Sequence, residues 1–351
     1  MTRFTWLLSR TQTLVMAGLL GALALTTGIT GVHLSHLYHS LVTPCAANND
    51  CGLAIGQFVN HYNFLQGSLM FLLRIAPAVI GLFWGAPLIA RELETGTYRL
   101  AWTQSVSRRR WVLTKLAFIG GTTIVVAGLL TLTITWWYRA LDSIDDNMWG
   151  VFDARDVVPI GYTFFAFMSA ALFGAIIRRT VPAMASALGV FVFTRIAVQL
   201  WVRPHFLSPR HVIAGLTGDG FGIFIRNGTP DLVVKAGGPS GSSVLSSQLV
   251  DHSGHAVGLA ERTAFLAQNC PLIGSQPPPL PKADAPRPVP PAVQAAFDHC
   301  ISQASHAFHV LVTYQPASRY WPFQWMELGL YVLLGLLAAA GCFWWVTRKI
   351  T

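Results

Sequence analysis

The sequence predicts an all-α membrane protein: six transmembrane helices, an N-terminal interfacial elbow helix, and an extracytoplasmic mixed α/β insertion between helices 5 and 6. Two observations carry this prediction. Of the 351 residues, 53% are hydrophobic and only 11% are charged, whereas soluble domains carry about 25% charged residues. Apolar runs also recur at the length of about 20 residues that crosses a bilayer.

Six apolar runs are the predicted spans. Their bounds are Leu14–Val32, Ser68–Ala90, Leu116–Tyr138, Pro159–Ile177, Val181–Val202 and Trp321–Val346. Residues 1–11 place Trp6, Leu7 and Leu8 between two arginines, a pattern typical of an amphipathic helix in the membrane interface. A cleaved signal peptide is the competing interpretation, but the run that follows is too long for a signal-peptide core.

The basic residues set the predicted orientation. Lys and Arg near the ends of spans stay in the cytoplasm. With both termini inside, the cytoplasmic segments carry 2, 6, 2 and 2 Lys and Arg, and the two short outer loops carry none and two. The predicted domains are a membrane domain of residues 1–202 with a cytoplasmic loop 91–115, an extracytoplasmic domain 203–320, and a last span with its tail, 321–351. The net charge of +9 thus reflects topology and excludes a nucleic-acid footprint.

Four of the five cysteines fall in segments predicted to lie outside, where disulfides form. Four cysteines allow three pairings. Cys45–Cys51 and Cys270–Cys300 are favoured, because each pair shares a segment. Three histidines at every third position, beginning at His33, share one helical face. A solvated interfacial face explains them better than a metal site, and no metal site is assigned.

The outer segment has short strand-like runs at Phe221–Ile225 and Asp231–Lys235, and residues 292–313 are predicted to be helical. A proline-rich stretch at 275–291 is a polyproline-type connector. This insertion is either the place of substrate or partner specificity or a passive lid over the outer mouth.

Charged residues inside spans are usually paired or line a pathway, because exposure to lipid is costly. Arg195 lies eight residues inward of Arg203, ~12 Å, and Glu327 lies six residues inward of Trp321, ~9 Å, at 1.5 Å per residue. The similar depths predict an Arg195–Glu327 pair, with Gln324 one turn away. A brace and a contribution to a substrate pathway both remain open. Arg74 is expected to snorkel to the outer interface.

The stretch from Gly85-Ala86-Pro87 to Lys115 resembles the cytoplasmic loop of ABC-2 type transporter permeases. A second stretch, from Tyr314-Gln315-Pro316 to Glu327, is similar to many actinobacterial-type permeases. The resemblance implies a short coupling helix that docks on an ATPase. The ATPase-coupling residues it implies are Glu92, Glu94, Gly96, Thr97, Arg99, Arg108 and Arg110.

The resemblance also implies roles for these residues. The two glutamates would contact basic groups on the ATPase or cap the coupling helix, and Gly96 with Thr97 would form a turn. The arginines would pair with ATPase carboxylates or lipid phosphates, and for Arg109 lipid anchoring is preferred. No GxxxxGK[ST] phosphate loop and no GxSxG or zincin signature occurs in the sequence. The chain is therefore expected to be non-catalytic and to bind no cofactor directly.

The expected function is that of a permease in the cell membrane, driven by a separate ABC ATPase dimer that binds ATP and magnesium, and paired with a second, identical or similar permease chain. Export is the preferred direction, and the substrate stays open. The alternative is a membrane-anchored sensor or assembly factor that works through residues 203–320.

Overall fold

A computed structural model describes residues 18, 21–40, 52–97, 107–142, 148–216, 221–226, 229–234, 237–270 and 291–349. The chain divides into two compact units. One comprises Met1–Leu207 with Tyr320–Thr351, and the other is Ser208–Arg319. The predicted outer segment began at 203, whereas residues 203–207 belong to the first unit.

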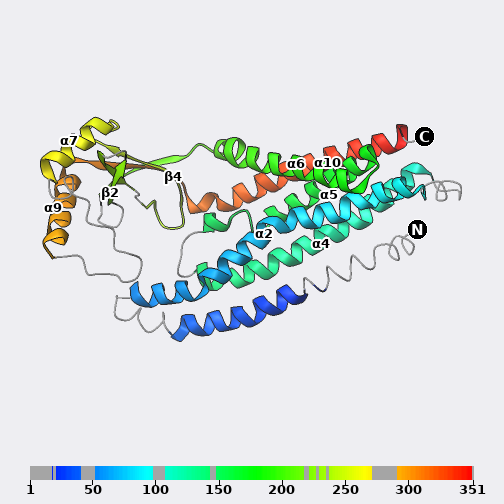
Figure 1. Cartoon of the computed structure of the whole chain (residues 1–351), viewed down its shortest axis with the longest axis horizontal. Coiled ribbons are helices and arrows are strands. Elements are labelled where there is room, and N and C mark those ends of the chain that lie inside the picture. The colour runs from blue at the N-terminus through cyan, green and yellow to red at the C-terminus, as the bar shows by residue number, and fades with distance from the viewer. Residues whose placement is uncertain are drawn as a thin grey trace. The chain divides into compact units, whose positions relative to one another are not determined.

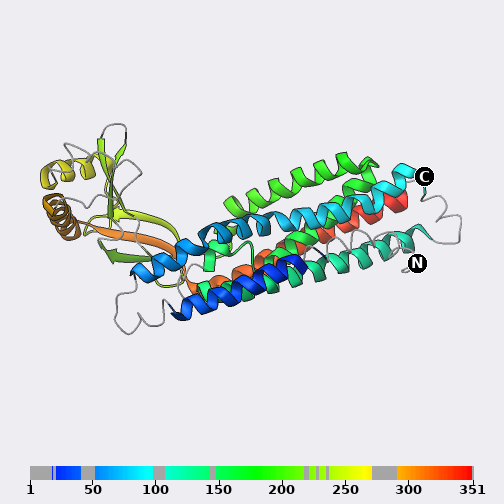
Figure 2. The ribbon, with the colours of Figure 1, turned by 60° about the horizontal axis from the view of Figure 1, so that its bottom comes forward.

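The first unit is a bundle of long helices that run alongside one another (Figures 1 and 2). Residues 21–40 are helical. The other helices are α2 (Gly52–Thr95), α4 (Arg108–Asp142), α5 (Val158–Ile177), α6 (Thr180–Ala197) and α10 (Tyr320–Arg348). Five stretches among the described residues are long and apolar enough to cross a membrane: Gln66–Thr95, Arg108–Tyr138, Val158–Ile177, Thr180–His205 and Ala317–Arg348.

These five stretches coincide with predicted spans two to six. Residues 21–32 of the predicted first span, Leu14–Val32, are helical, but its first residues and all of the elbow, residues 1–11, lie largely or wholly outside the described residues, so a sixth span stays a prediction. The predicted loop 91–115 is wrong in extent, because α2 continues to Thr95 and α4 already begins at Arg108. The reason is local: Arg, Glu, Leu and Lys dominate both ends of this stretch, and all four are strong helix formers.

Helix α5 lies at the centre of the bundle. It is apolar all round, as expected of a helix with neighbours on every side, and it is the most buried of the five candidate spans. Small residues let its neighbours approach: a Cβ on Gly81 or Gly85 of α2 would lie 2.4 Å from an atom of α5. A Cβ on Gly335 of α10 would likewise lie 2.6 Å from the ring of Phe164. Close packing through small residues is how membrane helices gain van der Waals contact.

The connection between α5 and α6 is very short, as the Arg178-Arg179-Thr180 sequence predicts. Arg178 adopts a left-handed conformation with φ 60° and its amide donates to the carbonyl of Gly174, 3.1 Å away. This αL residue closes the last turn of α5. Helix α6 then begins at Thr180.

Helix α6 changes its winding near its end. After Ala197 the chain forms a π-helical turn, Val198–Val202, followed by a 3₁₀ turn, Arg203–His205. π-helical turns are rare and are frequently found at functional sites. The turn separates Arg195 from Arg203, the two arginines of this segment.

The second unit contains a three-stranded antiparallel sheet, a hairpin and two helices (Figure 1). The sheet has the order β1 (Arg210–Gly215), β5 (His309–Gln315), β4 (Ser243–Val250), and the hairpin is β2 (Phe221–Arg226) with β3 (Thr229–Val234). The helices are α7 (Leu259–Asn269) and α9 (Pro291–Ala307). The predicted connector at 275–291 lies almost wholly outside the described residues.

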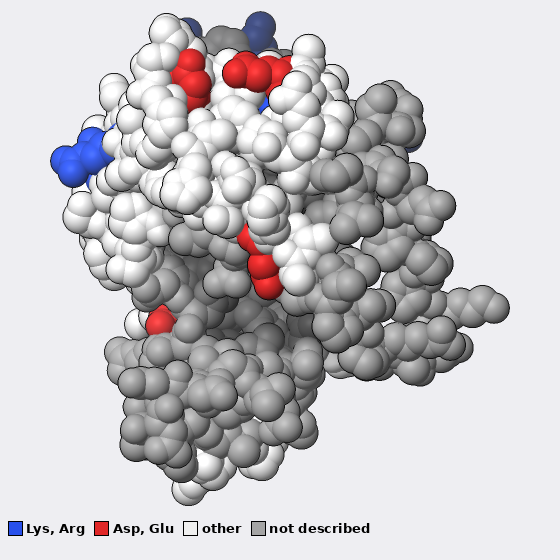
Figure 3. Space-filling model, turned by 90° about the vertical axis from the view of Figure 1, so that its left-hand side faces the viewer, with Lys and Arg blue, Asp and Glu red and all other residues white. Residues whose placement is uncertain are grey.

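The predicted helix 292–313 is wrong beyond Ala307, because β5 begins at His309 and forms the central strand of the sheet. Val310 and Val312 are fully buried, so this stretch follows the two-residue period of a strand. Figure 3 views the molecule from the left-hand side of Figure 1, and the described surface there carries only scattered charged side chains.

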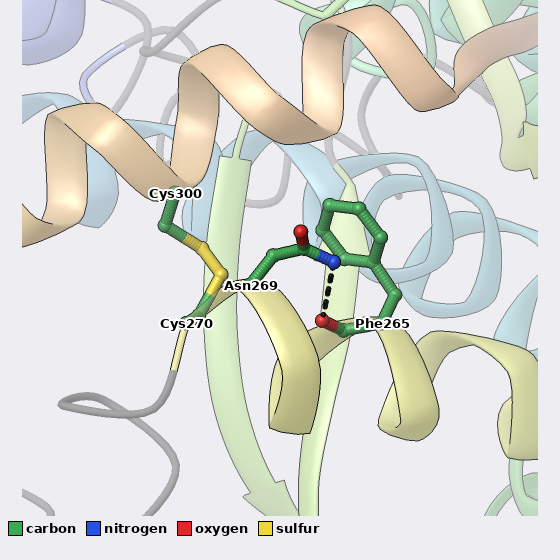
Figure 4. The surroundings of a disulfide bond; sticks show 4 residues. All are labelled: Phe265, Asn269, Cys270 and Cys300. Carbon is green, nitrogen blue, oxygen red and sulfur yellow. Dashed lines mark hydrogen bonds between the residues drawn. A yellow bond between two sulfur atoms is a disulfide. The ribbon is translucent and has the colours of Figure 1, made fainter.

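A disulfide joins Cys270, directly after α7, to Cys300 in α9, with their Cα atoms 5.3 Å apart (Figure 4). This is the pairing that the sequence favours. Beside it the Asn269 side-chain amide donates to the carbonyl of Phe265, 3.1 Å away. The disulfide thus ties the end of α7 to α9 within the core of this unit. Cys45 and Cys51 lie outside the described residues, so their pairing stays a prediction.

Candidate functional site

Two groups of polar residues stand out in the helical unit, one at each end of the bundle. The first, called the loop end here, comprises residues 91–97, 107–115 and 178–180. Lys115 of α4 is 7% exposed and forms an ion pair with Glu92 of α2. The Lys115 ammonium also lies 3.4 Å from the carbonyl oxygen of Leu88 and 4.3 Å from the centre of the Trp111 ring. These contacts fasten the end of α2 to the start of α4.

Glu94 makes the second tie at the loop end. One of its carboxylate oxygens accepts hydrogen bonds from the hydroxyl and the amide of Thr180, at 3.1 and 3.4 Å. Thr180 is the first residue of α6, and a carboxylate is favourable at a helix start because the first amides lack partners there. Glu92 and Glu94 therefore link α2 to α4 and α6 within this chain, a role that the sequence did not predict.

The other residues expected to couple to an ATPase surround these ties. Gly96, with φ +73°, follows the last residue of α2 and turns the chain away from the helix axis. The hydroxyl of Thr97 lies 3.1 Å from that of Thr95. Arg108 and Arg110 fall in the first turn of α4, where the amide of Arg110 lies 3.4 Å from the Ser107 hydroxyl.

Basic side chains cover the outside of the loop end. Arg110 is exposed, and Arg99 lies outside the described residues. The exposed basic residues on the ends of these helices are Arg91, Arg109, Arg110, Arg178, Arg179, Arg348 and Lys349. The loop end is therefore an internally fastened set of helix ends with a basic exterior.

The second group lies toward the opposite ends of the same helices. Glu327 of α10 is 1% exposed and accepts two hydrogen bonds from Arg203, at 2.7 and 2.8 Å. The hydroxyl of Tyr162 in α5 donates to the same carboxylate. A bidentate guanidinium and a phenol satisfy this buried acid, which would otherwise be very costly.

The prediction of an Arg195–Glu327 pair is therefore wrong, because Glu327 forms its ion pair with Arg203. Arg195 instead donates to Asp153, at 3.1 Å, and its guanidinium lies 3.7 Å above the Tyr162 ring. A similar depth in the membrane does not by itself determine which of the two arginines, Arg195 or Arg203, pairs with Glu327. Arg195 still belongs to the same group, since Tyr162 contacts both Arg195 and Glu327.

Arg74 does not simply snorkel. Its guanidinium forms an ion pair with Asp153 at 3.2 Å and donates to the carbonyl of Gly150 at 3.1 Å, although the side chain is 47% exposed. Asp153 is thus shared by Arg74 of α2 and Arg195 of α6. The sequence indicated only that the loop around Asp153 is acidic, whereas the structure shows that Asp153 links α2 to α6.

Gln324 joins α10 to the 148–157 segment. Its amide donates to the carbonyl of Phe152 at 2.9 Å, and its oxygen accepts from the amide of Val158 at 3.1 Å. Gln324 is fully buried. It therefore fixes the entry into α5, and among the described residues it makes no hydrogen bond to Arg195 or Asp153.

Arg155 is buried at the centre of the 148–157 segment. Its guanidinium pairs with Asp142 at 2.7 Å and with Asp156 at 3.3 Å, and it donates to the Tyr320 hydroxyl at 3.3 Å. Burial alone would lower the pKa of Arg155, but hydrogen bonds to Tyr320 and Asp142 outweigh it and raise that pKa above its ordinary value. The sequence missed Arg155, Asp153, Arg203 and Tyr162 because none of them interrupts an apolar run.

Together these side chains form what we call the arginine network. It contains four arginines and four acids, so its formal charges cancel. The members are Arg74, Arg155, Arg195, Arg203, Asp142, Asp153, Asp156 and Glu327. Among the residues that the structure describes, no group of three or more His, Cys, Asp or Glu could hold a metal ion. The ion pairs of this network link α2, α6 and α10 to neighbouring segments.

Comparison with known proteins gives one match. A family model described as ABC-2 membrane transporter related matches residues 17–203. The matched segment takes in α2, α4, α5 and α6, and therefore both Glu92 and Glu94, and it ends at Arg203. No curated protein and no solved structure matches the chain.

Proposed function

The chain belongs to the ABC-2 membrane transporter related family, and from this premise we propose that it exports a substrate, driven by an ATPase that docks at the loop end. Membership makes the chain a multi-pass permease subunit of an ABC transporter, with an ABC ATPase subunit as its partner. Permeases of this family are generally non-catalytic. The direction of transport, the docking site and the coupling path are our proposals.

The loop end carries the proposal. The Glu92–Lys115 pair ties α2 to α4, and Glu94 ties α2 to the start of α6. A force on any of these three helix ends therefore acts on the other two. In our proposal the ATPase dimer binds ATP and magnesium, closes, and moves the loop end, and the bound helix ends carry that movement into the membrane.

Docking and transmission fall to different residues in this proposal. Exposed Arg110, with Arg108 and Arg99, pairs with carboxylates on the ATPase, and Arg109 contacts lipid phosphates. Glu92 and Glu94 transmit movement, because both are engaged within the chain. A second permease chain completes the pathway, and the loop end faces the cytoplasm, as its basic residues favour.

The test separates docking from transmission. Arg110→Glu should lower the amount of ATPase that co-purifies with the chain at least tenfold, and Arg109→Glu, its neighbour on the same turn, is the matched control that should retain the ATPase. Glu92→Gln should retain the ATPase but uncouple its turnover from transport. If Arg109→Glu and Arg110→Glu lose the ATPase equally, the basic surface acts only by net charge and the assignment of Arg110 is wrong.

The sensor alternative has one observation in its favour: Ser208–Arg319 forms a compact unit with its own apolar core and a disulfide. If no ATPase co-purifies with the wild-type chain in mild detergent, the transport proposal fails, and binding partners should be sought with this unit.

A further inference from the structure

The π-helical turn Val198–Val202 stands between the two arginines that hold α6 in the arginine network. Arg195, before the turn, pairs with Asp153, and Arg203, after it, pairs with Glu327. Arg195 lies over the Tyr162 ring, and Arg203 lies 3.5 Å from the Tyr162 hydroxyl. Both arginines therefore point to the same side of the segment.

A regular α-helix would not align them. Arg203 lies eight positions after Arg195 in the sequence. At about 100° per residue they span about 800°, which is about 80° beyond two full turns. In a π turn each hydrogen bond reaches one residue further, so the chain winds less per residue and this excess is taken up. The π turn thus brings both arginines to the side of Tyr162.

We propose that the π turn is the hinge of α6: during transport it winds into α-helix, Arg203 swings away from Glu327, and the end of α6 is released from α10. The proposal rests on the function proposed above, because ATP-driven movement of the loop end reaches α6 through Glu94 and Thr180. Helix α6 suits this movement, since it is the least buried of the five candidate spans.

The network already contains a second partner for the released acid. When Arg203 leaves, Glu327 keeps the Tyr162 hydroxyl. The guanidinium of Arg195 lies over the face of that same ring, and its buried Nη1 makes no hydrogen bond to any residue in the described part of the chain. Asp153 meanwhile retains Arg74. Glu327 and Asp153 therefore each keep a cation within reach whether Val198–Val202 is π-helical or α-helical. This avoids an unpaired buried charge.

Removing one residue from the turn gives a direct test of the hinge. Deletion of Leu200, which is 59% exposed, places the two arginines seven positions apart along the chain. As a regular α-helix these span about 700°, about 20° short of two turns. The deletion should thus keep both ion pairs with no π turn, so the protein stays folded but the hinge is absent. Leu200→Ala keeps the length and is the matched control.

The measurement is hydrogen exchange by mass spectrometry on the full chain in complex with its ATPase, without nucleotide and with ATP, magnesium and vanadate. In the wild type and in Leu200→Ala, amides of Val198–Val202 should become at least tenfold more protected in the nucleotide state, while those of Thr180–Phe191 stay unchanged. The deletion variant should bind the ATPase, and its amides in this segment should be highly protected both with and without nucleotide. It should lose ATP-driven transport.

The outcomes separate the two proposals. If the complex forms and exchange at Val198–Val202 is the same in both nucleotide states of the wild type, the hinge is refuted and the transport proposal stands. Full turnover of the deletion variant also refutes the hinge. Should the deletion variant fail to fold, the wild-type comparison alone decides. If no ATPase binds the wild type, both proposals fall together.

Discussion

The ion pair between Glu92 and Lys115 gives the sharpest quantitative prediction, because its two partners differ in burial. The Lys115 side chain is 9% exposed and that of Glu92 is 17% exposed. Replacing Glu92 by Leu removes the carboxylate that pairs with the Lys115 ammonium, which keeps its contacts to the Leu88 carbonyl at 3.4 Å and the Trp111 ring at 4.3 Å. Removing one partner of a buried pair costs about 3–5 kcal/mol, and these two contacts place the loss near the lower figure.

The reverse change should cost less. Lys115→Met leaves a carboxylate on the more exposed side of the pair, where it can turn to water, so we expect a loss of about 1–2 kcal/mol. The double variant Glu92→Leu with Lys115→Met removes both charges and should lie within about 1 kcal/mol of the wild type. The expected coupling between the two sites is therefore about 3 kcal/mol or more, far above that of independent sites.

The assay is reversible unfolding of the purified chain by SDS in mixed micelles, followed by far-ultraviolet circular dichroism. Arg109→Ala, an exposed neighbour in the first turn of α4, is the control and should change the free energy of unfolding by less than about 0.5 kcal/mol. A double variant whose loss equals the sum of the two single losses would show that the pair is not coupled and would refute the reasoning.

Three further predictions concern the rest of the chain. Gly85→Leu should prevent α2 from packing on α5, because its Cβ alone would lie 2.4 Å from the carbonyl of Phe167; gel filtration should show aggregate, whereas Gly121→Leu, where a Cβ meets nothing within 4 Å, should remain monodisperse. Cys270→Ser opens a disulfide that spans 30 residues and should destabilise Ser208–Arg319 by about 3–4 kcal/mol; limited proteolysis should then cut this unit in the variant, and a reductant should have no further effect on it. Arg155→Met leaves two acids without their cation and should lower the free energy of unfolding by about 3 kcal/mol; the same SDS titration measures it, and a change below about 1 kcal/mol would contradict the buried role of Arg155.

Hydropathy placed the five described spans well, because an apolar run of about 20 residues has few alternatives to crossing a membrane. It failed where helices leave the apolar run. Residues 52–66 and 91–95 of α2 are helical although they lie outside the apolar run of the predicted span, so the sequence suggested loops. The helix predicted for residues 292–313 was wrong at His309–Gln315 for a different reason. A short apolar run after a helix can either continue the helix or form a strand.

The candidate site was predictable only in part. The sequence pointed to Glu92, Glu94, Arg195 and Glu327 as special, and all four are engaged in ion pairs or hydrogen bonds. Their partners could not be read from spacing, because the rise along a helix gives depth but not direction. The π turn, Val198–Val202, has no sequence signature, yet it lies between the two arginines that pair with Asp153 and Glu327.

The Arg203–Glu327 pair also sets a condition on how the chain is made. Arg203 leaves the ribosome 124 residues before Glu327. At about 5–20 residues per second, roughly 6–25 s pass between them. During that time the turn that follows α6 carries an arginine whose carboxylate does not yet exist, so the nascent chain depends on the insertion machinery or on lipid phosphates to shield it. A ribosome that stalls within residues 208–319 would leave a membrane intermediate with this cation unpaired, and quality control could recognise it by that charge.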